Sequence, residues 1–296
     1  MSKRVLVTGA MGMLGRTLLP ILQDKKYCCV GIARNAGKVG KIPVQKCDIS
    51  NYNAVKKVIA KFKPDFVIHL ASITGNMECE ENPELTFLVN VQGTFNILNA
   101  IKDSECKIIF SSSREVYGMT SKLVHEESKL NPINLNGITK EISEKLILNY
   151  NRVYKIPYVI LRFSNFYSLQ NTSRGISKMI KNAVEGKPII IYGGNQTIDL
   201  LNINDATNAI IKSANYTKSG IFNIGSGKTI TPNILIKKLE KISQKKIKRI
   251  KKPYRPFEVK KFHFDISSAV KNLKFKSKLS FEDDLSEFVK RYSFTK

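Results

Sequence analysis

Residues 4–15 read RVLVTGAMGMLG, and this stretch decides the fold. The apolar, β-branched run Arg4–Thr8 predicts a short buried strand. Gly9, Gly12 and Gly15 follow at three-residue spacing and open a helix predicted over 13–24. Glycine suits a tight turn that lies against a pyrophosphate, and a helix N-terminus attracts that anion. The stretch therefore predicts a dinucleotide-binding loop; the alternative is a Gly-rich turn without a ligand.

Strand and helix patterns alternate after this unit. Alternation of this kind predicts parallel βαβ units and an α/β fold with a Rossmann-type, doubly wound parallel sheet. The predicted strands are 28–33, 66–70, 107–112 and 158–163, and the predicted helices are 51–62, 83–102 and 137–154.

The pattern loosens in the second half of the chain. Further strands are predicted at 189–192 and 220–225, and further helices at 204–216, 233–244 and 281–291. We expect a smaller C-terminal substrate-binding lobe beside the sheet. The expected division is a dinucleotide-binding domain at 1–165, to which 200–224 returns, and a substrate lobe formed by 166–199 and 225–296.

The end of the second predicted strand bears on the choice of cofactor. An acidic residue there bonds the adenosine ribose of NAD, but this chain has Arg34 in the sequence GIARN. Arginine can receive a 2′-phosphate, so NADP is favoured over NAD; alternatively, Arg34 lies over the adenine or in solvent. Asp48 and Ile49 are candidates for adenine contact, although Asp48 also suits the cap region of the helix at 51–62.

Composition limits the class of protein. The 296 residues are 42% apolar and 25% charged, and no run reaches the ~18 apolar residues of a membrane span. The N-terminus shows no signal-peptide pattern, so a cytoplasmic protein without membrane association is expected. The three histidines and five cysteines form no ligand cluster, so no metal site is expected.

The formal net charge is +25, which raises the question of a nucleic-acid partner. Of the 49 basic residues 39 are lysine, whereas base readout and bidentate phosphate contacts favour arginine. The densest run, 237–261, has apolar residues spaced like a helix followed by a strand. We therefore interpret the charge as a solvated face that also attracts anionic nucleotide substrates, and nucleic acid is the less favoured partner.

Several motifs, taken together, resemble one family. They are TGAMGMLG at 8–15, HLAS at 69–72, Asn90, FSSSREVYG at 110–118, GITK at 137–140, LRFSNFY at 161–167, FNIGSG at 222–227, and Arg255. The chain resembles the extended short-chain dehydrogenase/reductases, the NAD-dependent epimerase/dehydratase family that acts on nucleotide sugars. The resemblance covers nearly the whole chain.

The resemblance implies roles for individual residues. Ser113 would hydrogen-bond the sugar hydroxyl that is oxidised, and Lys140 would bind the nicotinamide ribose. A nucleotide-diphosphate sugar is the implied partner, and helices 83–102 and 137–154 are the implied homodimer interface. The implied binding residues are Gly9, Gly12, Met13, Leu14 and Gly15 for the pyrophosphate, Leu70, Ala71 and Ser72 for the nicotinamide ribose, Asn90 on the cofactor side, and Asn165 and Arg255 for the substrate diphosphate.

Glu115 lies two residues after the serine, a spacing that resembles 4,6-dehydratases and nucleotide-uronate decarboxylases. There a carboxylate near the sugar takes a proton or orients the ring. The neighbouring Arg114 would instead hold Glu115 ionised and favour binding. The alternative is a capping or salt-bridged residue at the edge of the site.

Two positions depart from the family pattern. Asn136 stands where the family has its proton-carrying tyrosine, and an amide takes up no proton at neutral pH. Ile198 stands where many relatives carry a phosphate-binding arginine. Three accounts remain open: an enzyme that uses Glu115, Ser113 or water as proton carrier, a degenerate binding relative, and an introduced change in an ordinary enzyme. We favour an NAD(P)-dependent nucleotide-sugar epimerase/dehydratase-type enzyme that oxidises the sugar C4 hydroxyl.

Overall fold

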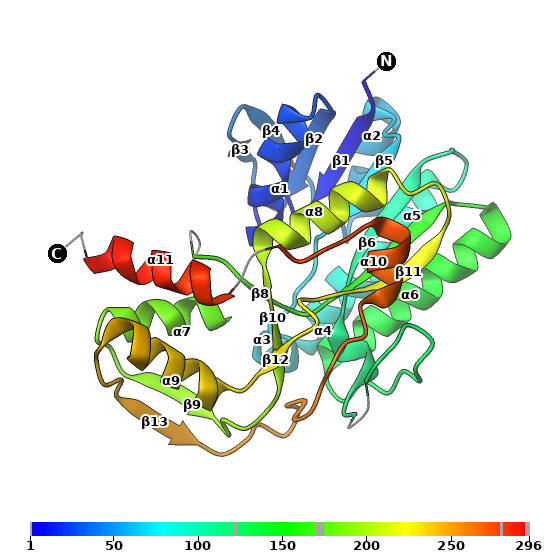
Figure 1. Cartoon of the computed structure of the whole chain (residues 1–296). Helices are drawn as coiled ribbons and strands as arrows, with labels where there is room; N and C mark the ends of the chain where they lie inside the picture. Colours follow the sequence, from blue (N-terminus) through cyan, green and yellow to red (C-terminus); the bar gives the residue numbers. More distant parts are fainter. Residues whose placement is uncertain (1, 121–122, 170–174, 279–280, 294–296) are drawn as a thin grey trace.

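An eight-stranded sheet forms the centre of the computed structural model, which describes residues 2–120, 123–169, 175–278 and 281–293 (Figure 1). The strand order is β11-β7-β6-β5-β1-β2-β4-β3. The strands are β1 (Arg4–Thr8), β2 (Cys28–Ala33), β3 (Gly37–Val39), β4 (Ile42–Lys46), β5 (Phe66–His69), β6 (Lys107–Ser113), β7 (Tyr158–Phe163) and β11 (Gly220–Ile224).

The pairing confirms the predicted sheet. Neighbouring strands are parallel throughout except for the edge hairpin of β3 and β4. β1 lies between β2 and β5, and the chain order reverses on either side of it, as in a doubly wound fold. The carboxyl ends of β1, β5 and β6 therefore lie along one edge of the sheet, where such folds bind their ligands.

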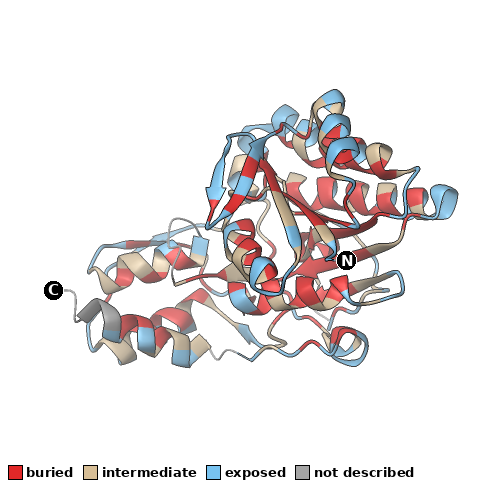
Figure 2. Ribbon diagram, turned by 90° about the horizontal axis from the view of Figure 1, so that it is seen from above, coloured by how far each residue is buried: buried red, intermediate tan, exposed pale blue. Residues whose placement is uncertain are grey.

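Helices cover both faces of the sheet. α1 (Met13–Asp24), α8 (Ile203–Ala214) and α10 (Ser267–Leu273) share one apolar core with the sheet, and α2 (Tyr52–Phe62), α5 (Gly93–Ile101) and α6 (Leu135–Tyr154) share the other. Figure 2 shows the buried faces of these helices turned toward the strands. Late in the chain, β11 pairs with β7 and forms one edge of the large sheet.

The long helix predicted at 83–102 is interrupted in its middle. It consists of α4 (Pro83–Phe87), a π-helical turn η1 (Leu88–Gln92) and α5, and a short helix α3 (Asn76–Glu81) precedes it. Asn90 lies in the π turn, and its side chain bonds to Ile73 and Ser72 in the loop after β5. π turns recur at functional sites, and this one places Asn90 against the end of β5.

A smaller lobe lies at the left of Figure 1. Its own apolar core lies between a two-stranded sheet and three helices, and includes Ile191, Leu239 and Phe288. The basic run 237–261 forms a helix followed by a strand, as predicted. The elements are β9 (Ile189–Tyr192), β13 (Arg249–Lys252), α7 (Gly175–Val184), α9 (Pro232–Ser243) and α11 (Phe281–Ser293).

A three-stranded sheet leads from the large sheet to the smaller lobe. It has the order β12-β10-β8 and is formed by β8 (Asn165–Tyr167), β10 (Ile198–Asn202) and β12 (Thr229–Ile230). The segment 225–296 does not stay in the smaller lobe, because Ala269, Leu273 and Phe275 pack into the core of the large sheet. Among the described helices, none has an apolar stretch of the length that a membrane crossing requires.

Candidate functional site

The glycine loop after β1 packs against the end of β5. Gly9 has a φ of +67°, and a Cβ at this position would lie 2.7 Å from the backbone nitrogen of Ala71 and 2.9 Å from the carbonyl carbon of Leu70. Only glycine meets both the conformation and the space. The loop therefore lies directly beside Leu70 and Ala71, two residues expected along the nicotinamide ribose.

The first turn of α1 begins at this loop. Its N-cap residue, Gly12, provides no side-chain hydrogen bond to the helix, so no side chain covers the N–H groups of Met13 and Leu14. A Cβ on Gly15 would lie 2.6 Å from the carbonyl oxygen of Ala10, which keeps the helix close to β1. A strand, a close glycine turn and an uncapped helix start together fit the pyrophosphate of a dinucleotide.

Buried side chains connect the glycine loop to Asn90. The Thr8 hydroxyl accepts from the backbone N–H groups of Leu70 and Ala71, so its own proton points to His69 Nδ1 at 2.7 Å. His69 Nε2 then donates to Thr94 at 3.1 Å. Burial and the charge of Lys140 lower the pKa of His69 to about 3, so the imidazole is neutral and acts as a structural link.

Asn90 uses both ends of its amide. Oδ1 accepts from the Ser72 hydroxyl at 2.9 Å and from the Ile73 N–H at 2.8 Å, and Nδ2 donates to the Ile73 carbonyl and to Thr139, both at 2.9 Å. Thr139 precedes Lys140 on α6. Asn90 thus ties the loop after β5 to the helix that carries the candidate catalytic lysine.

Lys140 is 3% exposed and has an unusual environment. Nζ donates to the Ser111 carbonyl at 2.6 Å and lies 4.8 Å from the centre of the Phe110 ring. Burial lowers the pKa of this ammonium to about 8, while Cys79 and Glu144 act in the opposite direction. An ammonium that donates one hydrogen bond retains further N–H donors, which suits a ribose diol.

Asn136, on the first turn of α6, is 4% exposed. Its Nδ2 donates to the Thr74 carbonyl at 3.1 Å and to Asn76 Oδ1 at 3.2 Å, whereas its Oδ1 is buried without a partner among the described residues. The amide is therefore held toward the loop at 74–76. Sequence reasoning did not find the Thr74 and Asn76 contacts, because they join distant segments.

Ser113, Arg114 and Glu115 form a tight turn at the end of β6. The Ser113 hydroxyl oxygen accepts from the Glu115 N–H at 3.2 Å, so its proton remains available to donate. Arg114 forms an ion pair with Glu115 Oε1 at 2.9 Å, and Asn134 Nδ2 donates to Oε2 at 2.6 Å. Glu115 is thus a paired carboxylate, as in the salt-bridged alternative. Asn134, which was not predicted, caps α6, and an N-cap pattern could have found it.

A second group of residues lies in the segment before α10. The Arg255 guanidinium stacks on Tyr192, 3.8 Å from the ring centre. Glu258 lies close enough to Arg255, Glu115 and Arg114 to interact with all three electrostatically, and burial raises the pKa of its carboxyl. The segment thus approaches the turn at 113–115. Tyr192 and Glu258 carried no recognisable signal in the sequence.

Two further expected residues lie on the connecting sheet. Asn165 is on β8, in register with Leu200. Ile198 is buried in the small apolar cluster that includes Tyr167 and Leu200. Position 198, where the family resemblance leads us to expect an arginine, therefore belongs to the core of this chain.

Four buried side-chain atoms of the described residues have no hydrogen-bond partner. They are Arg114 Nη1, Asn136 Oδ1, Asn165 Oδ1 and Arg255 Nε. Three of these residues were predicted site residues, and the fourth lies between Ser113 and Glu115. Buried polar groups are nearly always satisfied, so orphan groups confined to one set of residues point to a polar ligand.

The residues expected at the adenosine end are less constrained. Arg34 is exposed, and no hydrogen bond or ion pair of its side chain occurs in the described part of the chain. Asp48 accepts from the N–H and the hydroxyl of Ser50 at 2.9 and 2.8 Å, which is a local turn next to α2. Ile49 is buried in the core shared with α5. Arg34 is therefore free to meet a ligand, whereas Asp48 and Ile49 also have structural partners.

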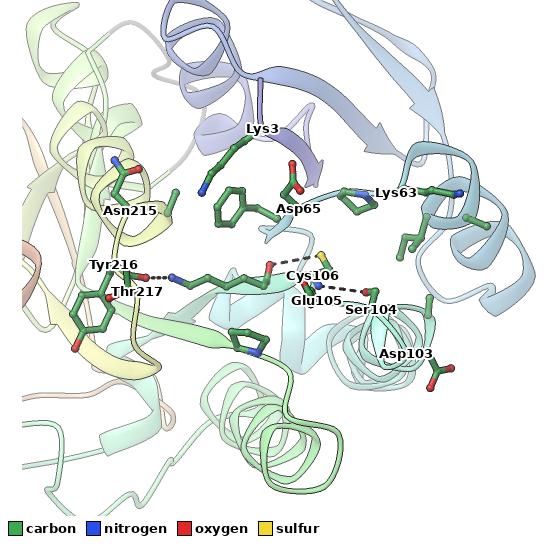
Figure 3. Close-up of a pocket in the computed structure, with 18 residues that line it drawn as sticks. Lys3, Lys63, Asp65, Asp103, Ser104, Glu105, Cys106, Asn215, Tyr216 and Thr217 are labelled. Atoms are coloured by element: carbon green, nitrogen blue, oxygen red, sulfur yellow. Dashed lines mark hydrogen bonds between the residues drawn. The ribbon is translucent and has the colours of Figure 1, made fainter. Parts of the chain in front are cut away.

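A cavity of about 840 Å³ lies at the opposite edge of the sheet (Figure 3). Lys3, Asp65 and Lys107 line it where β1, β5 and β6 begin. Lys107 Nζ donates to the carbonyls of Ser213 and Tyr216, so this buried cation is already partnered. Ligands of doubly wound sheets bind at the carboxyl ends, so we do not assign this cavity to the site. Within the described ranges, no group of three or more His, Cys, Asp or Glu residues could hold a metal ion.

Comparison with known proteins agrees with this geometry. Residues 5–225 match the model of the NAD dependent epimerase/dehydratase family. A putative UDP-glucose 4-epimerase of Methanocaldococcus jannaschii is 32% identical over 304 residues, which cover 97% of this chain and 96% of that protein. The chain belongs to the NAD-dependent epimerase/dehydratase family.

Two solved structures show the likeness in three dimensions. The UDP-glucose 4-epimerase of Thermotoga maritima, solved with UDP-glucose, has a TM-score of 0.92 and 25% identity and covers 99% of both chains. The UDP-glucuronic acid 4-epimerase of Bacillus cereus, solved with UDP-glucuronic acid and NAD, has a TM-score of 0.89 and 28% identity. It covers 99% of this chain and 100% of that one. The family resemblance read from the motifs is thereby confirmed.

Proposed function

We propose that this chain is an NAD(P)-dependent enzyme of the epimerase/dehydratase type that oxidises the C4 hydroxyl of a nucleotide-diphosphate sugar. The four unpaired polar atoms on Arg114, Asn136, Asn165 and Arg255 support the proposal, because three of these residues are expected site residues and the fourth lies between Ser113 and Glu115. Relatives named for UDP-glucose and UDP-glucuronate support a sugar of this class.

The glycine loop and the residues around Lys140 fit a dinucleotide. Gly9, Gly12 and the start of α1, which has no side-chain cap, would hold the pyrophosphate, and Lys140 would donate to the nicotinamide ribose. When bound, the cofactor supplies the hydride acceptor. NADP stays the favoured form on the evidence of Arg34, although the Bacillus cereus neighbour was solved with NAD.

The remaining steps belong to this chain's own side chains. Ser113 donates a hydrogen bond to the sugar hydroxyl and orients it. Arg114 and Asn134 pair with the two carboxylate oxygens of Glu115, so Glu115 has a binding role in this proposal rather than the role of proton carrier. Asn136 orients the substrate through Oδ1 but takes up no proton from it. Turnover therefore depends on a proton route other than position 136, and we expect it to be about 10²–10⁴-fold slower than with a positioned acid/base.

A second candidate function is a binding relative that performs little chemistry. Two observations favour it: an amide, Asn136, occupies the position of the proton-carrying tyrosine, and Glu115, a candidate proton carrier, is ion-paired. Such a protein would retain dinucleotide and nucleotide sugar without converting them.

We also infer that the protein is a homodimer. Leu85, Leu88 and Phe95 are exposed at helical spacing along α4, η1 and α5, and Leu148 is exposed on the adjacent α6. Phe95 meets Tyr150 of α6 edge to face, at 6.2 Å between ring centres, so the two helices form one continuous surface. A contiguous apolar surface of this kind marks an association site.

The test compares the parent chain with Asn136→Tyr. Both proteins are incubated with NAD or NADP and with UDP-, GDP- and dTDP-linked sugars, and products are separated by chromatography. Turnover by the parent supports the enzyme and a different proton route. Turnover by the tyrosine variant alone shows that position 136 silences a competent site. If neither converts a sugar while cofactor and nucleotide sugar still bind, the binding function replaces the proposal.

A further inference from the structure

Arg114 is a buried arginine with one guanidinium nitrogen unaccounted for. Its side chain is 9% exposed, Nη2 is paired with Glu115, and Nη1 is buried without a partner among the described residues. A buried charged N–H group is costly unless an acceptor meets it. The free nitrogen therefore calls for an acceptor atom that the described residues do not provide.

The position of this guanidinium is fixed from two sides. Its carbon lies 5.1 Å from the centre of the Phe262 ring. Phe262 is held by Thr197, whose hydroxyl accepts from the Phe262 N–H at 2.6 Å and bonds the Phe262 carbonyl at 2.9 Å. On the other side, Asn134 holds the carboxylate of Glu115. Such a prearranged guanidinium suits recognition of a fixed anionic group.

The charged groups around Arg114 are compatible with a bound anion. Glu115 is balanced by Arg114 itself, and Arg255 has an unpaired Nε of its own. Glu258 is the remaining carboxyl in this group; burial raises its pKa, and Gln196 Nε2 donates to it at 3.5 Å. Two guanidinium groups thus have open N–H donors, while one of the two nearby carboxyls is already paired.

In the proposed function, Arg114 and Arg255 lie at different ends of the ligand. Arg114 directly follows Ser113, the residue assigned to the sugar hydroxyl, whereas Arg255 is assigned to the diphosphate. An acceptor for Arg114 therefore belongs to the sugar. Carboxylate oxygens form stronger and shorter hydrogen bonds with guanidinium than hydroxyl oxygens do.

We propose that Arg114 is a specificity residue that binds a carboxylate on the sugar, so that the preferred substrate is a nucleotide-linked uronic acid. The inference rests on the proposed function, because it assumes that the sugar lies at Ser113. It concerns binding, and it holds whether or not the chain turns the sugar over.

The test measures dissociation constants of the full chain, with NAD present, for UDP-glucuronate, UDP-glucose and UDP by isothermal titration calorimetry. We expect UDP-glucuronate to bind at least about tenfold more tightly than UDP-glucose. Arg114→Gln keeps an N–H donor but removes the charge, and we expect it to abolish this preference. Arg114→Lys, which keeps the charge, should retain part of it.

Arg255→Gln is the matched control, since it should weaken all three ligands, including UDP, which lacks the sugar attached to the diphosphate. Binding of UDP to each Arg114 variant reports whether the site is still folded. Equal affinity of the parent for UDP-glucuronate and UDP-glucose overturns the inference, as does a preference that survives in Arg114→Gln. If the parent binds none of the three ligands, the proposed function fails as well, and the two failures are thus told apart.

Discussion

The side chain of Asn134 joins the start of α6 to the carboxylate of Glu115. Its Oδ1 accepts from the Gly137 N–H at 2.8 Å and caps the helix, and its Nδ2 donates to Glu115 Oε2 at 2.6 Å. One amide therefore positions the helix that carries Asn136 and Lys140 relative to the turn that carries Ser113. Asn134 is thus one of the residues that link the two halves of the candidate site.

Asn134→Ala should consequently cost more than an ordinary helix cap. Loss of a cap costs about 1 kcal/mol, and an unpaired buried carboxylate oxygen adds about 1–3 kcal/mol. Thr231→Ala is the matched control, because Thr231 caps α9 in the smaller lobe through one bond to the Ile234 N–H. We expect urea unfolding to show the larger loss for Asn134→Ala, accompanied by weaker UDP-sugar binding. Equal losses in the two variants would contradict this account.

The sheet and the cofactor loop could be predicted from sequence because their signals are local. Buried parallel strands appear in the sequence as short apolar runs. The loop requires glycine at positions 9 and 15, because a Cβ at either position would collide with nearby backbone atoms. The interruption at Leu88–Gln92 could not be predicted, because it depends on bonds from Asn90 to a loop formed by Ser72 and Ile73.

The candidate site was only partly predictable for the same reason. Ser113, Glu115 and Lys140 stand in recognisable motifs. Arg114 and Asn134 are the partners that determine the role of Glu115. Only Arg114 could be considered from the sequence, because it is adjacent to Glu115 in the chain. Tyr192 and Phe262, which stack on Arg255 and Arg114, come from segments far away in the chain.

Lys140 carries a stability cost that depends on pH. Its pKa falls from 10.5 to about 8 on folding, so the unfolded chain binds more protons between these values and stability rises with pH there. Lys140→Met should therefore stabilise the fold by about 3 kcal/mol below pH 8, and this gain should shrink toward pH 10.5. The same variant should bind NAD more weakly.

Thermal or urea unfolding of parent and variant across pH 7–10 measures this gain. Only the difference between the two proteins is informative, because burial also lowers the pKa of Lys107 to about 8. Lys145→Met is the control on the same helix; it removes an exposed ion pair with Glu141 and should change stability by less than about 1 kcal/mol. A gain for Lys140→Met that is the same at every pH argues against a buried ammonium as its cause.

Arg34 tests the choice between the two dinucleotides. The side chain is exposed and unpaired within the described residues, so Arg34→Ala should leave the unfolding free energy unchanged. A charge-assisted bond to a 2′-phosphate is worth about 1.5–3 kcal/mol, so NADP affinity should fall about tenfold or more while NAD affinity is unchanged. Calorimetric titration suits this chain, which has no tryptophan. Lys61→Ala, on the exposed side of α2, controls for net charge, and equal effects of Arg34→Ala on both cofactors speak against the assignment.

The exposed apolar residues of α4, η1, α5 and α6 predict the state of association. The parent should sediment with twice the 33.4 kDa mass of one chain, and Leu88→Glu should yield monomers because it places a charge inside the interface. Val270→Glu is the matched control: Val270 is 46% exposed, close to the 44% of Leu88, but lies on α10 on the opposite face of the sheet. Analytical ultracentrifugation of the three proteins decides the matter. A dimer that survives Leu88→Glu, or one that Val270→Glu disrupts, places the contact on another surface, since each substitution adds the same charge at the same degree of exposure.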